Sequence, residues 1–285
     1  MELALANDKE EAAAVLRAHG AQVSLFFAAE KGMTDEIAAH ISAGQDVKAC
    51  NENGRTPLDL ALANNQEEAV ALLRSNNAVE GKELKERVHK AWRDAGKVVL
   101  IDHVAFGALY EDYTMVFGNF NTFKTDVKFS AGKFYYELDI KNIRGIAQFG
   151  WAMEGFESST ESTSEGVGDN AFSWGFDGVR VSKWGDGSSS TFGAAWQEGD
   201  VLGLACDMVN KSVSFSVNGS FEPPLGVAFD SIAADSIAPA FTANSGFKVV
   251  ANFGHLPFKH APPDETFVSV HAAAQKYTVG SLMHV

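Results

Sequence analysis

The spacing of hydrophobic residues along this 285-residue chain changes near residue 95. Before that point alanine, leucine and glutamate predominate, and apolar residues such as Ile37 and Ile41 recur at the spacing of a one-sided helix. After Lys97, phenylalanine, glycine, valine and serine become frequent, and apolar and polar positions alternate. Alternation with a period of two is typical of half-buried strands. The pattern therefore predicts a helical part followed by a β part.

The helical part repeats itself. Leu60–Asn64 has the same sequence as Leu3–Asn7, and matching residues follow both segments in one register. The segment Asn51–Ala61 reads Asn-Glu-Asn-Gly-Arg-Thr-Pro-Leu-Asp-Leu-Ala and resembles the ankyrin-repeat signature, in which Thr56 would cap a helix. The resemblance covers roughly residues 1–80 and implies a short all-α ankyrin-repeat solenoid. Because repeat stacks generally need about three units, so short an array is expected to lean on the second domain.

The β part contains many short alternating segments. In Lys133–Ile140 the residues Phe134, Tyr136, Leu138 and Ile140 fall on one strand face, and the polar residues fall on the other. Another alternating segment ends in Asn218-Gly219, a strong hairpin signal. Further strands are predicted at 146–152, 172–176, 179–183, 201–206 and 248–253. Many short strands with turn signals between them favour an antiparallel sandwich.

Seven short motifs then occur in the order that SPRY domains show. They are Gly132–Glu137, Phe149–Ala152, Trp174–Gly178, Trp196–Gly203, Asp207 followed by Val213–Gly219, Pro239–Phe241 and Asn252–Gly254. The resemblance covers roughly residues 98–260 and implies an all-β, concanavalin-like SPRY sandwich. Trp151, Trp174 and Trp196 are expected to fill its core, because each can bury a large area. The predicted organisation is ankyrin repeats at 1–80, a helical linker at 81–97, a SPRY domain at 98–262 and a C-terminal tail at 263–285.

Charge and composition narrow the range of partners. The formal net charge is −14, from 23 basic and 37 acidic residues, so nucleic acid and membrane surfaces are not expected partners. Cys50 and Cys206 form neither a disulfide framework nor a zinc set. The N-terminus lacks the basic start and apolar stretch of a signal peptide. We therefore expect an intracellular, cytoplasmic protein.

The strongest enzymatic hypothesis rests on Glu137 and Asp139, which alternate along one strand. Sandwich glycoside hydrolases carry three acidic residues at such positions, but Lys141 occupies the third position here. An outward polar strand face is the favoured interpretation. The eight histidines are scattered, and no phosphate-binding loop or nucleophile elbow is present. We expect no catalysis, no cofactor and no metal.

SPRY domains bind peptides or protein surfaces through loops on a rigid sandwich. Three loops of this chain align with those loops: Tyr110–Tyr113, Glu154–Asn170 and Thr242–Gly246. Within the second loop, Phe156 is expected either to anchor a partner or to tuck into the core. The candidate protein-binding residues of the SPRY part are Tyr110, Glu111, Asp112, Tyr113, Phe156, Asp169, Asn170, Asn244 and Ser245. The acidic and polar character of the loops favours a ligand with basic or amide groups.

Ankyrin repeats bind through turn tips and the concave helix face, which implicates Glu52, Asn53, Arg55 and Asp59. The resemblances together imply a protein-interaction adaptor or scaffold, with the repeats as second contact or brace. The architecture resembles ubiquitin-ligase substrate adaptors. The alternative is a lectin-like sandwich that binds a carbohydrate or another small ligand, in which exposed rings such as Tyr135 and Trp184 would stack on sugars.

Overall fold

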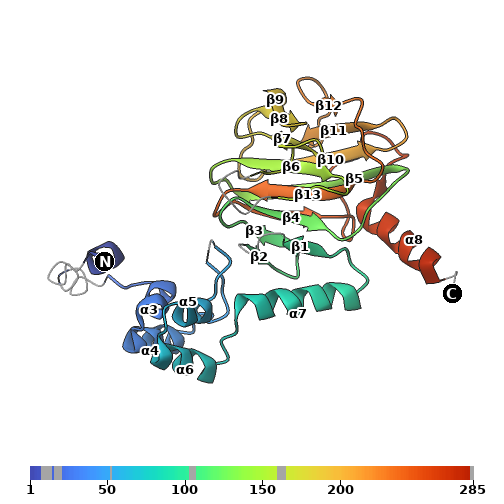
Figure 1. The fold of residues 1–285 in the computed structure, drawn as a ribbon. Helices are drawn as coiled ribbons and strands as arrows, with labels where there is room; N and C mark the ends of the chain where they lie inside the picture. Colours follow the sequence, from blue (N-terminus) through green and yellow to red (C-terminus); the bar gives the residue numbers. More distant parts are fainter. Residues whose placement is uncertain (8–14, 16–20, 52, 103–106, 159–164, 283–285) are drawn as a thin grey trace. The chain divides into compact units, whose positions relative to one another are not determined.

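The computed structural model describes residues 1–285 apart from 8–14, 16–20, 52, 103–106, 159–164 and 283–285 (Figure 1). The chain forms two compact units, Met1–Leu84 and Lys85–Val285. The boundary lies within helix α7 (Gly81–Asp94). None of the described helices is long and apolar enough to cross a membrane.

The first unit is built from short helices. They are α1 (Glu2–Ala6), α3 (Leu25–Lys31), α4 (Thr34–Ser42), α5 (Pro57–Ala63) and α6 (Glu67–Ser75). Ala28, Ala29, Ala61 and Ala69 are fully buried where α3 and α5 contact each other and their partner helices. Small side chains allow the helix backbones to approach closely. In the described residues, consecutive helices contact each other in two pairs, α3 with α4 and α5 with α6, and a stacked solenoid remains a prediction.

The helix starts follow the sequence signals. Ser24 accepts a hydrogen bond from Phe27 N at the start of α3. Thr56 forms a capping box with Asp59, in which the Asp59 carboxylate also accepts from Thr56 N at 2.7 Å. Pro57 occupies the first turn, where its missing N–H would have had no intrahelical partner.

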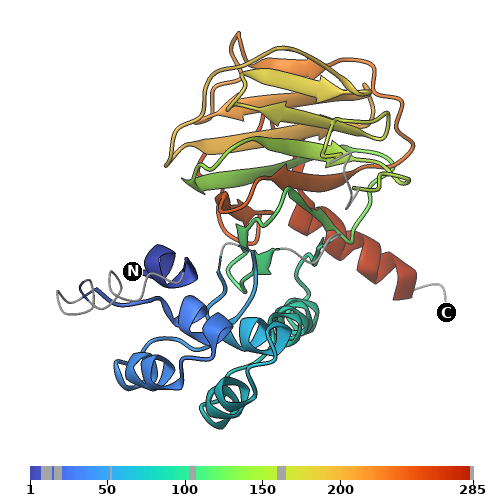
Figure 2. The same cartoon turned by 60° about the vertical axis from the view of Figure 1, so that its left-hand side comes forward.

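The second unit is a sandwich of two sheets, apparent as two layers of arrows in Figure 2. Except for a short parallel strand near the C-terminus, the strands pair in antiparallel fashion, which confirms the predicted antiparallel sandwich. The seven-stranded sheet has the order β1-β4-β13-β6-β7-β8-β9 and the eight-stranded sheet the order β12-β11-β10-β5-β14-β3-β2, with β15 beside β5.

The strand bounds in the seven-stranded sheet are β1 (Leu100–Asp102), β4 (Asn121–Thr125), β6 (Ala147–Ala152), β7 (Ser173–Asp177), β8 (Ser182–Gly185), β9 (Ser188–Thr191) and β13 (Ala238–Ala243). In the eight-stranded sheet they are β2 (Ala108–Leu109), β3 (Thr114–Val116), β5 (Lys133–Asn142), β10 (Val201–Asp207), β11 (Ser212–Val217), β12 (Gly226–Phe229), β14 (Lys248–Asn252) and β15 (Val268–Ser269).

Aromatic side chains from alternate strand positions fill the space between the sheets. Trp151, Trp174 and Trp196 are buried, which confirms their predicted core role. The Trp196 ring stacks on Phe149 with a centroid separation of 5.3 Å and an interplanar angle of 7°. Offset and edge-to-face ring pairs of this kind add to the stabilisation that burial of apolar area provides.

Segments expected to be a linker and a tail contribute to this sandwich. From the second half of α7, Val88 and Trp92 are buried with the sandwich core. Near the C-terminus, β15 pairs in parallel with the start of β5, and α8 (Val270–Leu282) buries Val270 and Ala273 in the same core. Neither segment is an independent appendage.

Candidate protein-binding site

The first predicted loop is the turn between β2 and β3. Tyr110, Glu111 and Asp112 are exposed, and they line a shallow hollow of about 420 Å³ together with Thr114 and Lys248. Asp112 stabilises the turn, because its carboxylate accepts from Thr114 N at 3.0 Å. Three of the four predicted residues of this loop therefore face solvent at one surface of the eight-stranded sheet.

Tyr113, the fourth, is a core residue, and the interpretation of it as a contact residue is wrong. Its side chain is fully buried and stacks on Trp92 at 4.6 Å, and its hydroxyl donates to Val98 O at 2.6 Å. Burial, reinforced by the Asp126 charge, raises the pKa of Tyr113 well above its usual value. The sequence places Tyr113 in a turn, but it does not show that Trp92 of helix α7 covers the Tyr113 ring.

The described parts of the second loop, residues 154–158 and 165–170, place Phe156 and Val167 on the outer face of the seven-stranded sheet. Phe156 is buried against Val167 and two small strand residues, Ala152 and Ala240. Of the two expectations for Phe156, the core position is the observed one, so its ring is not available as an anchor. The small side chains beneath leave room for the ring, which fixes the first part of the loop to the sheet.

The far end of this loop is held by polar contacts. Asp169 accepts from Gln148 Nε2 and from Gly166 N, both at 2.7 Å. Burial raises the pKa of Asp169. Asn170 accepts from Phe172 N at 3.0 Å through its Oδ1. These two predicted contact residues are half-buried and organise the loop itself.

The third loop connects β13 to β14. Asn244 accepts from Ile146 N at 2.7 Å and closes this loop against the β5–β6 connection. Ser245 is half-buried. In the register of β6 and β13, Ala152 pairs with Ala238 and Ala147 pairs with Ala243, so Asn244 lies at the opposite end of these strands from the start of the second loop. The far end of the second loop does reach the third, because Val167 N donates to Thr242 Oγ1 at 3.1 Å.

On the helical unit, Glu52 lies outside the described residues. Arg55 is exposed at the turn, and Asn53 is half-buried with its N–H bonded to Asn51 Oδ1 at 3.0 Å. Asp59 is a capping residue whose carboxylate also accepts from Gly81 N at 3.0 Å. Of these four positions, Arg55 is the described side chain that faces solvent.

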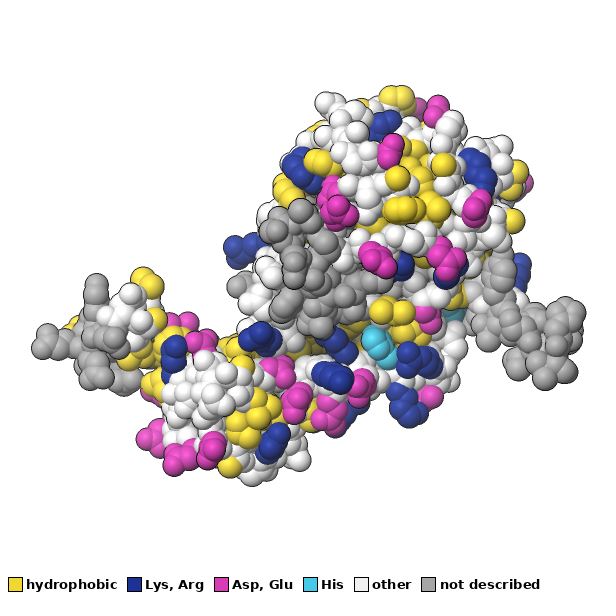
Figure 3. Space-filling model, viewed as in Figure 1, with side chains coloured by type: hydrophobic (Ala, Val, Ile, Leu, Met, Phe, Trp, Pro, Cys, Tyr) yellow, Lys and Arg dark blue, Asp and Glu magenta, His cyan; other side chains and the backbone are white. Residues whose placement is uncertain are grey.

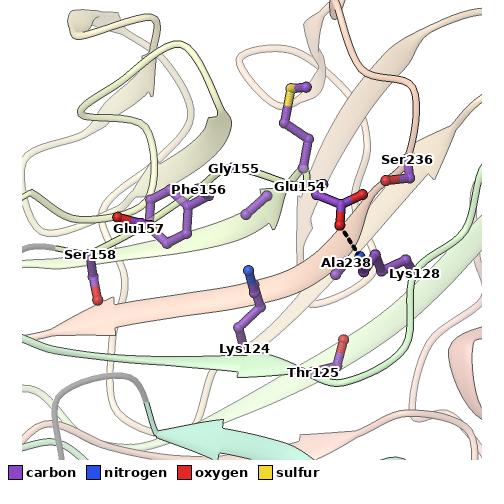
Figure 4. A pocket seen from close by; sticks show the side chains of 12 residues that line it. Lys124, Thr125, Lys128, Glu154, Gly155, Phe156, Glu157, Ser158, Ser236 and Ala238 are labelled. Atoms are coloured by element: carbon purple, nitrogen blue, oxygen red, sulfur yellow. Dashed lines mark hydrogen bonds and ion pairs between the residues drawn. The ribbon is translucent and has the colours of Figure 1, made fainter.

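A deeper hollow lies at the start of the second loop (Figure 4). It has a volume of about 460 Å³, within the range of ordinary ligand pockets. Its wall on one side is β4 and the residues after it, and its opposite rim is the segment Met153–Ser158. The start of β13, with Ser236 just before it, completes the lining. Two walls therefore belong to rigid strands and one to a loop.

Sequence reasoning missed the two lysines of this hollow, Lys124 and Lys128, which share its lining with Glu154 and Glu157. Lys128 pairs with Glu154 at 2.6 Å (Figure 4). The Lys124 ammonium lies 5.9 Å from the centre of the Phe156 ring. Burial, followed by the nearby Lys128 charge, lowers the pKa of Lys124. Phe123 points into the core, so the alternation of β4 predicts that Lys124, the next residue, lies on the outer face of the sheet. The local sequence does not indicate that the second loop contacts this face.

Acidic and basic side chains are interspersed with patches of apolar ones on the face of the protein that Figure 3 shows.

The strand carrying Glu137 is not an outward polar face as predicted. Glu137 is buried, and its carboxylate accepts from Lys259 N and His260 N, both at 2.8 Å. Tyr135 is buried beneath Phe258, with ring centroids 4.8 Å apart. The expected exposed ring for sugar stacking is therefore covered at Tyr135.

Comparison with known proteins agrees with this geometry. Residues 133–256 match the SPRY domain family, and residues 25–74 match the family of ankyrin repeats in many copies. This chain carries ankyrin repeats and a SPRY domain. Both are protein-interaction domains, so a protein-interaction role follows for the ankyrin–SPRY chain.

Two curated relatives are each similar to about half of this ankyrin–SPRY protein. E3 ubiquitin-protein ligase RKP of Arabidopsis thaliana is 33% identical over 151 residues, 52% of this chain and 11% of the relative. ATP-dependent RNA helicase Ddx1 of Drosophila melanogaster is 32% identical over 134 residues, 46% of this chain and 17% of the relative. The chain thus spans less than a fifth of either relative. The crystal structure of the SPRY domain of human HERC1 matches with a TM-score of 0.45 and 14% identity, over 53% of this chain and 94% of that one.

Proposed function

We propose that this protein is an adaptor whose SPRY domain binds a segment of a partner protein in the hollow lined by Lys124, Met153–Ser158 and Ser236. The ankyrin repeats serve as a second contact or as a brace. The observation that carries the proposal is the hollow itself, because it combines rigid strand walls with a loop rim. A rigid scaffold limits the entropy cost of presenting a binding loop.

The test fills the hollow and compares partner retention. Full-length protein carrying Ser158→Arg with Ser236→Arg would place two long side chains in the hollow, whose rim includes both serines. The matched control is Ser188→Arg with Ser190→Arg on the exposed strand β9. We expect a protein captured from cell lysate by the wild type and by the control to be lost with the filled variant.

Retention of the same partners by a folded filled variant would remove the hollow as the binding site. If the double variant fails to fold, Ser236→Arg alone repeats the comparison with a single change. If an Arg55→Glu variant keeps the partners that the filled variant loses, the ankyrin repeats support the SPRY domain and do not contact the partner.

A ubiquitin ligase is one setting for such an adaptor, because one relative of this chain is an E3 ubiquitin-protein ligase. The shared region is 11% of that relative, so the proposal transfers no ligase activity. The role predicts that captured partners include ligase subunits and that depletion of this protein raises the abundance of the bound substrate. Unchanged substrate abundance would separate the adaptor from ubiquitylation.

A further inference from the structure

Residues 258–267, which we call the lid, lie on the outer face of the eight-stranded sheet over β5. Every residue of the lid is half-buried or exposed. The surface loop that contains it is closed at its base, where His271 N donates to Phe253 O at 2.8 Å, and Phe253 and Val270 are fully buried in the core. Surface loops whose ends meet are frequently functional. The lid can therefore leave the sheet without removing a side chain from the core.

The lid buries two side chains of β5 that would otherwise face solvent. Tyr135 is 1% exposed and Glu137 is 2% exposed, although both point away from the core. The Phe258 ring meets the Tyr135 ring edge-on, with centroids 4.8 Å apart. The backbone N–H groups of Lys259 and His260 both donate to the Glu137 carboxylate at 2.8 Å. The lid thus contacts β5 through one aromatic ring and two backbone donors.

The face beneath the lid is held in place by the sheet itself. Strand β5 is paired with β10 on one side and with β14 on the other. The Tyr135 hydroxyl donates to Glu137 at 3.3 Å, and it lies where a Cβ on Gly203 would come within 2.6 Å of it. Further along the same face, the Asp139 carboxylate pairs with Lys259 of the lid at 2.7 Å and with Lys141 at 2.5 Å. An open lid would leave a fixed ring and two carboxylates on one strand face.

The contacts that hold the lid are weak ones. Phe258 is half-buried, and the ion pairs of the lid, Lys259 with Asp139 and Asp264 with Lys133 at 3.7 Å, lie at the surface. Surface ion pairs contribute little to stability. Segments with few buried apolar contacts open locally at a lower free energy than the whole domain unfolds. We therefore expect the lid to open while the sandwich stays folded.

We propose that the lid occupies a binding face, and that a partner segment of the same chemistry displaces it. Such a segment presents an aromatic residue to Tyr135, followed by a basic residue that reaches Asp139 and by one further residue. The backbone N–H groups of the last two residues donate to Glu137. This face belongs to the opposite sheet from the hollow, so the inference does not depend on the proposed function. The lid lowers the apparent affinity for the segment in proportion to the fraction of molecules that are open.

The first measurement is amide hydrogen exchange in the full-length wild-type protein. The amides of Lys259 and His260 are expected to exchange at least tenfold faster than the slowest amides of β10, because the lid opens locally. Exchange of these two amides only at the rate of global unfolding would overturn the proposal. This comparison requires no variant.

The second measurement is binding of the lid sequence in trans. The probe is the fluorophore-labelled peptide Leu-Pro-Phe-Lys-His-Ala, the sequence of residues 256–261, blocked at both ends. Its binding is followed by fluorescence anisotropy. The Phe258 ring is half-buried, so Phe258→Ala should raise the open fraction about tenfold, less than the loss of a fully buried ring would. The full-length Phe258→Ala variant should therefore bind the peptide about tenfold more tightly than the wild type.

One opening equilibrium governs both measurements, so the increase in lid exchange and the increase in peptide affinity should agree within about threefold. Phe172→Ala is the matched control, because Phe172 is 42% exposed and lies next to the other sheet, and it should change neither quantity. A peptide with alanine in place of phenylalanine should bind about tenfold more weakly. Adding Glu137→Gln to Phe258→Ala should also weaken binding about tenfold, because one of the two backbone donors loses its acceptor.

Two results of the peptide experiment would overturn the proposal. Faster lid exchange in Phe258→Ala without tighter peptide binding would show that the uncovered face does not bind the segment. Peptide affinity that is unchanged by the added Glu137→Gln would place the peptide elsewhere on the protein. If Phe258→Ala does not fold, Phe258→Leu provides the same comparison with an expected change of a few fold.

Discussion

Removal of the Trp92 side chain is predicted to destabilise the SPRY sandwich even though this residue precedes the first strand. The indole is 1% exposed and stacks on Tyr113 at 4.6 Å with an interplanar angle of 16°. Its Nε1 donates to Glu111 O at 3.0 Å. Substitution of alanine therefore leaves a cavity beside Tyr113 and removes one hydrogen bond.

The size of the effect follows from these contacts. Replacement of a buried Trp by Ala typically costs about 3–5 kcal/mol, which includes the lost stacking. The Glu111 carbonyl lies on an exposed turn and can bond to water, so the lost hydrogen bond adds little. We expect Trp92→Ala to lower the free energy of unfolding by about 4 kcal/mol, a large fraction of the stability of an ordinary domain. For a domain of this size the melting temperature should fall by roughly 8–16 °C.

Tryptophan fluorescence during urea unfolding measures this effect in the full-length protein. All five tryptophans lie in the second unit, so the signal reports on the sandwich alone; they are Trp92, Trp151, Trp174, Trp184 and Trp196. Arg93→Ala is the matched control, because Arg93 is exposed on the same helix and should change stability by less than about 0.5 kcal/mol. A loss below about 1 kcal/mol for Trp92→Ala would refute the conclusion that α7 is part of the sandwich core.

Three further changes test separate features of the structure. Burial, with Lys97 and His271 nearby, lowers the pKa of His255 to about 4, so the unfolded chain binds more protons than the folded one below about pH 6.5. We therefore expect the free energy of unfolding of the sandwich to fall by about 1–2 kcal/mol between pH 7 and pH 4.5, and by less in His255→Gln. Equal losses in the two proteins would contradict this origin. Glu137→Gln should lower the free energy of unfolding by about 1–3 kcal/mol and speed proteolysis after residue 256, because an amide has one oxygen and cannot accept from both Lys259 N and His260 N as the carboxylate does. Unchanged cleavage would show that Glu137 does not hold the segment around Lys259. Asp59→Ala should destabilise the helical unit by about 1 kcal/mol, measured by hydrogen exchange of α5 and α6 amides, and exchange rates identical to those of wild type would rule out its capping role.

Sequence reasoning reached the features that depend on local periodicity. Strand alternation placed Phe134 and Tyr136 on the inner face, and both are buried in the core. The capping role of Thr56 followed from residue type and spacing alone. These features depend on the types and spacing of a few neighbouring residues, so a single sequence is enough to predict them.

The errors share a different cause. Alternation correctly separated Glu137 from the inner face, but the segment that buries it lies 122 residues further along the chain. Tyr113 was misjudged because α7 covers it from before the sandwich, and Phe156 because its loop folds back onto the sheet. Lys124 was missed because its significance depends on a loop about 30 residues later. Coverage of an outer sheet face is a long-range property that local patterns do not contain.

That coverage also explains where the proposed binding site lies. On the eight-stranded sheet the segment around Lys259 covers Glu137, and on the seven-stranded sheet Phe156 and Val167 cover the small residues of β6 and β13. The deep hollow lies where the second cover begins, so its rim is loop and its walls are strands. Substitutions in the rim can reshape the hollow without disturbing the sandwich core, whereas the position of Lys124 stays fixed by β4. The arrangement thus separates fixed strand walls from an adjustable rim, a combination that favours the proposed role in protein recognition.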